Sequence, residues 1–245
     1  MNYIVFDLEF NQSFDFKTGH PVHTNPECPF EIIQIGAVKL NSSFEIVDKI
    51  NFYIKPVIYL RIHPYVEKIT GITQQMLNTA HPFSFVYDEL IKFMSKDDML
   101  CSWGQDDVKS LYKNIRFHSL PTSKIPDHHI NAQKYATSFL NYEHGKSIGL
   151  KNAAELLDVH IDGDFHNALN DALYTAEIFK IVKPDILVAE KIKLSSININ
   201  LSRKKINTHS LYKYFINSLN RELTSEEKAI IKTAYKLGRN NLYNT

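Results

Sequence analysis

The chain has 245 residues, of which 44% are hydrophobic and 22% are charged, and its formal net charge at pH 7 is +1. This length is sufficient for one full hydrophobic core and leaves room for an appendage. The two cysteines, Cys28 and Cys101, are too few for a disulfide scaffold or a cysteine-based zinc site. No hydrophobic stretch approaches the length that crosses a membrane, and signal-peptide cleavage would remove an acidic motif that begins at Asp7. We therefore expect a reduced, cytoplasmic protein.

The first predicted element is a strand over residues 3–8, because its apolar run is rich in β-branched and aromatic residues. Side chains alternate between the two faces of a strand. Asp7 and Glu9 therefore project together, while Leu8 turns toward the core. Further strand-like runs follow at residues 31–40, 44–54 and 99–103.

Helical patterns lie between and after these strands. Residues 86–94 place apolar side chains at the i, i+4, i+7 and i+8 positions of an amphipathic helix. Small and apolar residues follow helical spacing again over residues 168–179. Three strands before the first strong helix predict an antiparallel meander followed by parallel additions, so the fold class is α/β.

Five residues that are far apart in the sequence have the chemistry of a metal-dependent nuclease: Asp7, Glu9, Asp107, His166 and Asp171. Four carboxylates packed together without cations would repel one another and raise one another's pKa values. Carboxylate oxygens suit Mg²⁺ or Mn²⁺. Two such ions about 3.5–4 Å apart can stabilise the attacking and the leaving oxygen of phosphodiester hydrolysis. A neutral histidine is a suitable general base for the attacking water.

Each of these residues also has a simpler interpretation. An acid at the end of a strand, such as Asp7, usually faces solvent. Asp106 and Asp107 could open a helix, because Asp is favoured at helix N-termini. His166 could precede a helix without a chemical role. The combination, rather than any single residue, indicates the nuclease site.

These residues lie in motifs that resemble the DEDDh 3′–5′ exonucleases of the ribonuclease H-like superfamily. Within that family the chain is most similar to the KapD and Eri-like exoribonuclease branch. The resemblance covers roughly residues 1–183. The matching segments are Val5–Phe10, Glu31–Val38, His63–Pro64 with Ile69–Thr73, Cys101–Asp107, Gly149–Ala153 and His166–Asp171.

The resemblance implies a mixed central sheet with helices on both faces and a site for two divalent cations, Mg²⁺ or Mn²⁺. In the second motif the family's acid stands three places after Gly104, which selects Asp107 over Asp106. The resemblance also implies that His166 is the general base. The implied metal ligands are Asp7, Glu9, Asp107 and Asp171. The predicted substrate contacts in this part of the chain are Leu8, Phe10, Thr70, Gly71 and Trp103.

The third motif sets a geometric condition. His166 and Asp171 are five residues apart, so on one continuous helix they would point about 140° apart. They can meet only if Asp171 lies on the helix and His166 lies on the chain that enters it. A turn signal over residues 162–164, directly upstream, permits this arrangement.

Beyond Pro184 the charge of the chain changes. Residues 184–245 contain 11 Lys or Arg against 5 Asp or Glu, a net charge of +6, whereas residues 1–183 contain 17 against 22, a net charge of −5. We therefore predict an exonuclease domain at 1–183 and a basic helical extension at 184–245. The extension has two helical patterns, the second of them behind a capping box at Thr224–Glu227. It either buries apolar faces against the main domain or guides nucleic acid. The substrate contacts predicted here are Arg203, Lys204 and Lys205.

The predicted function is hydrolysis of phosphodiester bonds from the 3′ end of RNA or single-stranded DNA, with release of nucleoside 5′-monophosphates. The resemblance to an exoribonuclease branch favours RNA. The alternative is a nucleic-acid-binding regulator of the sporulation type, which keeps the exonuclease fold but acts mainly through interaction. Four converging carboxylates favour the enzyme, because a binding module has no use for them.

Overall fold

The computed structural model describes residues 1–14, 24–142, 146–183, 190–192 and 208–239. The chain divides into two compact units, residues 1–199 and 200–245. The basic cluster Arg203, Lys204 and Lys205, predicted to contact substrate, lies outside the described residues. In the described part of the chain, no helix has the length and apolar character needed to cross a membrane.

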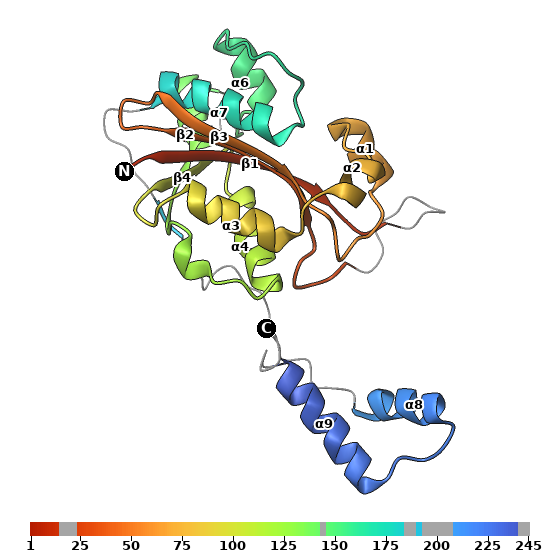
Figure 1. Cartoon of the computed structure of the whole chain (residues 1–245). Coiled ribbons are helices and arrows are strands. Elements are labelled where there is room, and N and C mark those ends of the chain that lie inside the picture. The colour runs from red at the N-terminus through yellow and green to blue at the C-terminus, as the bar shows by residue number, and fades with distance from the viewer. Residues whose placement is uncertain (15–23, 143–145, 184–189, 193–207, 240–245) are drawn as a thin grey trace. The chain divides into compact units, whose positions relative to one another are not determined.

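Within the described residues, the first unit is built on a six-stranded sheet whose strands lie in the order β3 (Ile46–Tyr53), β2 (Glu31–Leu40), β1 (Tyr3–Asn11), β4 (Met99–Ser102), β5 (His128–Asn131) and β6 (Glu190–Lys191) (Figure 1). β1 pairs antiparallel with β2, and β2 pairs antiparallel with β3. β4 is parallel to β1, and β5 is parallel to β4, which confirms the predicted meander with parallel additions. Because β6 pairs with β5, the first unit extends past the boundary predicted after residue 183.

Helices cover both faces of the sheet, as predicted (Figure 1). On one face lie α3 (Phe83–Phe93) and α4 (Asp106–Phe117), and on the other lies α7 (Ala168–Val182). The other helices described in this unit are α1 (Pro64–Thr70), α2 (Gln74–Thr79), the 3₁₀ helix η1 (Thr122–Lys124), α5 (Ala132–Phe139) and α6 (Leu150–Leu156).

The central strand β1 divides its side chains between two hydrophobic cores. Phe6 and Leu8 are at most 4% exposed and pack with the apolar residues of α3 and α4. Val5 is fully buried on the opposite face, where it packs against α7. Because side chains alternate along a strand, Asp7 and Glu9 continue the row of Val5 and also face α7.

Helix α7 lies very close to β2 at its N-terminal end, because β2 has no side chain at Gly36. A Cβ atom at this position would overlap the backbone of Ala168. Beside it, Gln34 Oε1 accepts a 3.2 Å hydrogen bond from the backbone N–H of Ala168, a group that has no partner within the helix. In the sheet these two β2 residues are the cross-strand partners of Asp7 and Glu9. The contact therefore brings the start of α7 to the two acids.

The second unit contains α8 (Thr208–Leu219) and α9 (Ser225–Arg239) among its described residues (Figure 1). The predicted capping box is confirmed. The Thr224 N–H donates to Glu227 Oε2 at 2.9 Å, and the Glu227 N–H donates to Thr224 Oγ1 at 3.2 Å. In the connection between the two helices, Leu223 is only 5% exposed and is therefore buried.

Candidate active site

Strand β1 supplies Asp7 and Glu9 to the face that α7 covers. Both side chains are partly exposed, so they can reach a ligand from solvent. The pairing of β1 with β2 shifts register between Glu9 and Phe10. The regular alternation that aligns the two acids therefore continues as far as Glu9 and is broken directly after it.

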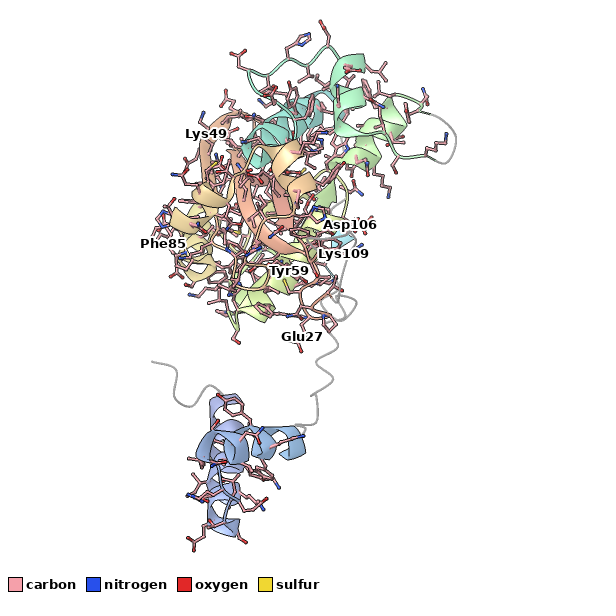
Figure 2. All side chains as sticks on the ribbon, turned by 90° about the vertical axis from the view of Figure 1, so that its right-hand side faces the viewer. Glu27, Lys49, Tyr59, Phe85, Asp106 and Lys109 are labelled. Carbon is pink, nitrogen blue, oxygen red and sulfur yellow. The ribbon has the colours of Figure 1, made fainter. Side chains whose placement is uncertain are left out.

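Helix α4 supplies Asp107 from its first turn, where Asp106 precedes it. The side chain of Asp106 is 98% exposed, and its Oδ1 lies 3.3 Å from the ammonium of Lys109 at the protein surface (Figure 2). Asp107 is partly buried instead, and the charge of Asp171 acts on it. The structure therefore directs Asp107, not Asp106, toward the other acids, which is the register expected from the sequence.

Asp171 lies in the first turn of α7, and His166 lies on the chain that enters it, as the geometric condition required. The N-cap is Asn167, whose side chain accepts hydrogen bonds from two backbone N–H groups of the first turn. The backbone N–H of His166 donates to Asp171 Oδ2 at 3.1 Å. His166 has a φ of 64°, and a non-glycine residue in this left-handed region costs about 1–2 kcal/mol. The hydrogen bond to Asp171 helps to hold this conformation.

Residues from two elements meet at one point of the site. Glu9 of β1, Asp171 of α7 and His166 each offer a ligand atom, and these three atoms all lie within 4.8 Å of one another. The side chain of His166 is exposed, whereas Asp171 is 8% exposed. The site is therefore open to solvent on the histidine side and closed on the helix side.

Each carboxyl group of the site is a weaker acid than it would be in water. Burial, and then the charges of Asp171 and Asp107, raises the pKa of Glu9 to about 8. Burial, and then the charges of Asp106 and Asp171, raises the pKa of Asp107 to about 7. The pKa of Asp171 is raised to about 6, because burial outweighs the hydrogen bond and charge of His166. The pKa of Asp7 is raised well above its usual value, first by burial and then by the charges of the other three acids.

A buried carboxylate oxygen of Asp171 fits a cation. Asp171 Oδ1 has no hydrogen-bond partner among the described residues, where the other such buried side-chain atom is Thr175 Oγ1. A buried acceptor without a partner is costly in free energy. Its neighbours are further carboxylates, which repel it, so a positive ligand is what the arrangement lacks. Hard oxygen donors of this kind suit Mg²⁺ or Mn²⁺.

The loop before His166 is attached to the first two turns of α7. Asn170 Nδ2 donates to the carbonyl oxygen of Asp164 at 3.0 Å. The ring of Phe165 stacks on Tyr174 with 4.4 Å between centroids. These contacts connect Asp164 and Phe165 of the loop to the helix that carries Asp171. The position of the His166 backbone is therefore tied to that of Asp171.

Three of the predicted substrate residues take part in packing. Leu8 is 4% exposed in the core, which leaves only its backbone to meet a substrate. Phe10 is partly buried against the same core. Trp103 is partly buried between two cores, and its Nε1 donates to the carbonyl oxygen of Ile148 at 3.2 Å. Substrate contact by Leu8, Phe10 and Trp103 stays a prediction.

Thr70 and Gly71 close helix α1. Thr70 Oγ1 donates to the carbonyl oxygen of Val66 at 2.8 Å. Gly71 has a φ of 69°, and its N–H donates to the carbonyl oxygen of Glu67. A left-handed residue that ends a helix is usually glycine, because a side chain is strained there. The helix end accounts for both residues, and their contact with substrate stays a prediction.

Asn11, at the end of β1, was not identified from the sequence. Its buried side chain donates to the carbonyl oxygens of Tyr59 and Arg61 at 2.8 and 2.9 Å, and accepts a 2.9 Å hydrogen bond from the His63 N–H. It thereby fixes the segment that leads into α1 against the strand that carries the acids. Only its position two residues after Glu9 hinted at this role. This segment also helps to line a hollow of about 250 Å³ formed by Gln12, Ser13, Phe14, Tyr59, Leu60 and Arg61.

Comparison with known proteins agrees with this geometry. Residues 4–179 match the exonuclease family RNase T. "Probable 3′–5′ exonuclease KapD" of Bacillus subtilis is 27% identical over 169 residues, which cover 68% of this chain and 80% of KapD. ERI1 exoribonuclease 3 of Homo sapiens is 26% identical over 162 residues, which cover 62% of this chain and 48% of that protein. A PolC-type DNA polymerase III of Clostridium perfringens is 26% identical over 241 residues, which cover 96% of this chain but 14% of the polymerase.

Among solved structures, the nuclease domain of 3′hExo, a DEDDh family member bound to rAMP, superposes with a TM-score of 0.65 and 26% identity. The match covers 78% of this chain and 97% of that domain, so the fold is ribonuclease H-like. The resemblance to KapD and the Eri-like exonucleases is thereby confirmed. The matched residues 4–179 contain all four acids and His166. The chain belongs to the RNase T exonuclease family.

Proposed function

We propose that the chain is a DEDDh-type 3′–5′ exonuclease that degrades single-stranded nucleic acid to nucleoside 5′-monophosphates. One observation carries this proposal: ligand atoms of Glu9, His166 and Asp171 all lie within 4.8 Å of one another. In agreement with this clustering, the charge of Asp171 raises the pKa values of Asp7, Glu9 and Asp107. Perturbed acids that converge in this way are typical of a catalytic site. A role limited to binding nucleic acid would gain nothing from them, because they repel a phosphate backbone.

The acids of the site would hold two divalent cations, Mg²⁺ or Mn²⁺. When bound, these ions supply charge stabilisation to the scissile phosphate and lower the pKa of a bound water. Asp171 offers its buried Oδ1, while its Oδ2 is held by the His166 N–H. Asp7 and Glu9 face the same space from β1, and Asp107 enters from α4. The proposed oxygen ligands thus lie at two positions of one strand and in the first turns of two helices.

His166 is the group that accepts a proton. One of its ring nitrogens lies within 4.8 Å of the ligand oxygens of Glu9 and Asp171, which is where an attacking water would be activated. The side chain is exposed, so it can pass the proton to bulk solvent after each cleavage. The hydrogen bond from its backbone N–H to Asp171 holds the start of the side chain in place.

RNA is the preferred substrate in this proposal. The chain covers 97% of the 3′hExo nuclease domain, which was solved with rAMP, and it resembles ERI1 exoribonuclease 3. The resemblance to a PolC-type DNA polymerase III favours DNA as the substrate, but the chain spans only 14% of that polymerase. Single-stranded DNA is therefore the second substrate to test.

A time course on matched RNA and DNA strands tests the proposal. Each strand carries a 5′ label and either a free or a blocked 3′ end, and each reaction contains Mg²⁺, Mn²⁺ or EDTA. We expect single-nucleotide shortening of strands with a free 3′ end, faster on RNA, and release of nucleoside 5′-monophosphates. Asp7→Asn should remove this activity, whereas Asp106→Asn, a matched change at an exposed acid, should keep it. Cutting of blocked strands or turnover in EDTA would exclude the mechanism.

A further inference from the structure

The second unit carries an excess of positive charge. Its described residues, 208–239, contain six Lys or Arg against three Asp or Glu. Residues 1–183, which hold the acids of the site, have a net charge of −5. A nuclease with this distribution repels its polyanionic substrate over the catalytic part of the chain and attracts it over the extension.

The ion pairs of this unit leave part of that charge available. Arg221 is neutralised by Glu227 in a two-pronged pair, with N–O distances of 2.6 and 3.0 Å. Lys213, Lys228 and Lys232 form no ion pair with the described residues. A paired arginine serves the fold of the helical hairpin, whereas unpaired ammonium groups are available to a ligand.

These three lysines come from two helices that are held together. The Tyr212 hydroxyl donates to the carbonyl oxygen of Lys228 at 3.3 Å and so ties α8 to α9. Lys232 follows Lys228 by four residues and lies on the same face of α9. Lys213 and Lys228 both line one hollow of about 450 Å³, whose full lining is Tyr212, Lys213, Ile216, Asn217, Glu222 and Lys228. With two lysines and one glutamate, the charge of this lining is +1.

We propose that this lysine face, formed by Lys213, Lys228 and Lys232, binds the phosphate backbone of the substrate strand upstream of the 3′ end being cleaved. The proposal rests on the proposed function, because its occupant is the same single-stranded nucleic acid. Each lysine that contacts a phosphate releases condensed counterions, which favours binding at low salt. On α8, Tyr214 is 68% exposed and is available to stack on a base. Unpaired cations and an exposed aromatic residue on the same pair of helices are the elements of a surface that binds single strands without sequence preference.

The test measures binding and cleavage separately in the full-length protein. Lys213, Lys228 and Lys232 are replaced by Gln together. Binding of a labelled RNA of about twenty nucleotides is then followed by fluorescence anisotropy in EDTA over a range of salt concentrations. We expect the Kd at about 50 mM salt to rise at least tenfold. The slope of log Kd against log salt should fall by about 2, since each phosphate contact on a single strand contributes about 0.7.

Hydrolysis of a dinucleotide in Mn²⁺ separates this proposal from the previous one. A dinucleotide has a single phosphodiester group, which the acids of the first unit engage, so the triple variant should cleave it at the wild-type rate. Absence of dinucleotide hydrolysis in the wild-type protein would count against the proposed function and leave the binding result intact. A triple Lys→Arg variant should restore the affinity for the long strand.

A matched control changes the same amount of charge elsewhere. Lys49, Lys55 and Lys124 are exposed in the first unit, and their joint replacement by Gln should leave the salt slope close to the wild-type value. Equal losses in the two triple variants would show that only net charge matters. An unchanged Kd and slope in the Lys213, Lys228 and Lys232 variant would also overturn the proposal.

Discussion

Replacing Gly36 by Ala should disturb the site without touching any acid. The new Cβ would overlap the backbone of Ala168 and Leu169 at the start of α7. Nonbonded carbon atoms settle at about 3.5–4.0 Å, so α7 must move away from β2 by on the order of 1 Å. Asp171 and His166 belong to this part of the chain and move with it, while the acids of β1 keep their positions in the sheet. A misplacement of about 1 Å costs about 10²-fold in rate, and overpacking costs about 1–3 kcal/mol of stability.

Urea unfolding and single-nucleotide release from a labelled oligonucleotide measure the two effects of Gly36→Ala. Gly149→Ala is the control, because nothing lies within 4 Å of a Cβ at that position, and it should change both values little. If Gly36→Ala does not fold, Gln34→Leu removes the hydrogen bond to the Ala168 N–H without a backbone clash. Near-native turnover and unfolding free energy in Gly36→Ala would refute the idea that the contact of α7 with β2 sets the spacing of the acids.

Without metal, the melting temperature should fall as the pH rises from about 4 to about 8. Glu9, Asp107 and Asp171 keep protons in the folded state up to about pH 8, 7 and 6, whereas the unfolded chain releases them near pH 4. Mn²⁺ added at pH 8 should reverse the loss, and a melting temperature in EDTA that rises over this range would contradict the clustering. Asp107→Asn should abolish cleavage in saturating Mn²⁺ and Asp106→Asn should not. The opposite result would show that Asp106, and not Asp107, is the ligand. His166→Ala should lower kcat about 10²–10⁴-fold and remove the acid limb of the pH–rate profile, with Mn²⁺ affinity by calorimetry unchanged. Unaltered turnover in this variant would exclude His166 as the general base.

Local rules were sufficient to anticipate the arrangement of the acids. Strand alternation places Asp7 and Glu9 on one face, and the helical period excludes His166 from the helix that carries Asp171. Both expectations agree with the structure, because each depends only on backbone geometry over a few residues. The helices of the C-terminal unit were equally visible, since their apolar spacing and capping box are local signals.

Contacts between distant segments could not be anticipated in the same way. β5 has the sequence His-His-Ile-Asn, which is too polar to suggest a buried strand. Inside the fold, however, the ring Nε2 of His129 lies 2.9 Å from Ser102 Oγ on β4, and burial lowers the pKa of His129 to about 4. The sequence around Gly36 likewise does not predict why a glycine is needed there, because the backbone that it accommodates lies far along the chain at Ala168. The tertiary structure decides both cases.

The dual use of β1 limits how this protein can change over evolutionary time. Residues on one face of the strand fill the core with α3 and α4, and the next residues along supply the acids. Inserting or deleting one residue early in β1 would turn each following side chain to the opposite face of the sheet. The carboxylates of Asp7 and Glu9 would then enter the hydrophobic core, while Phe6 and Leu8 would point into the site. Conservative substitutions at the core positions of β1 can be accepted one at a time, but a change in the length of the strand cannot. Length variation among descendants of this chain should therefore accumulate after Asn11, where the strand has ended.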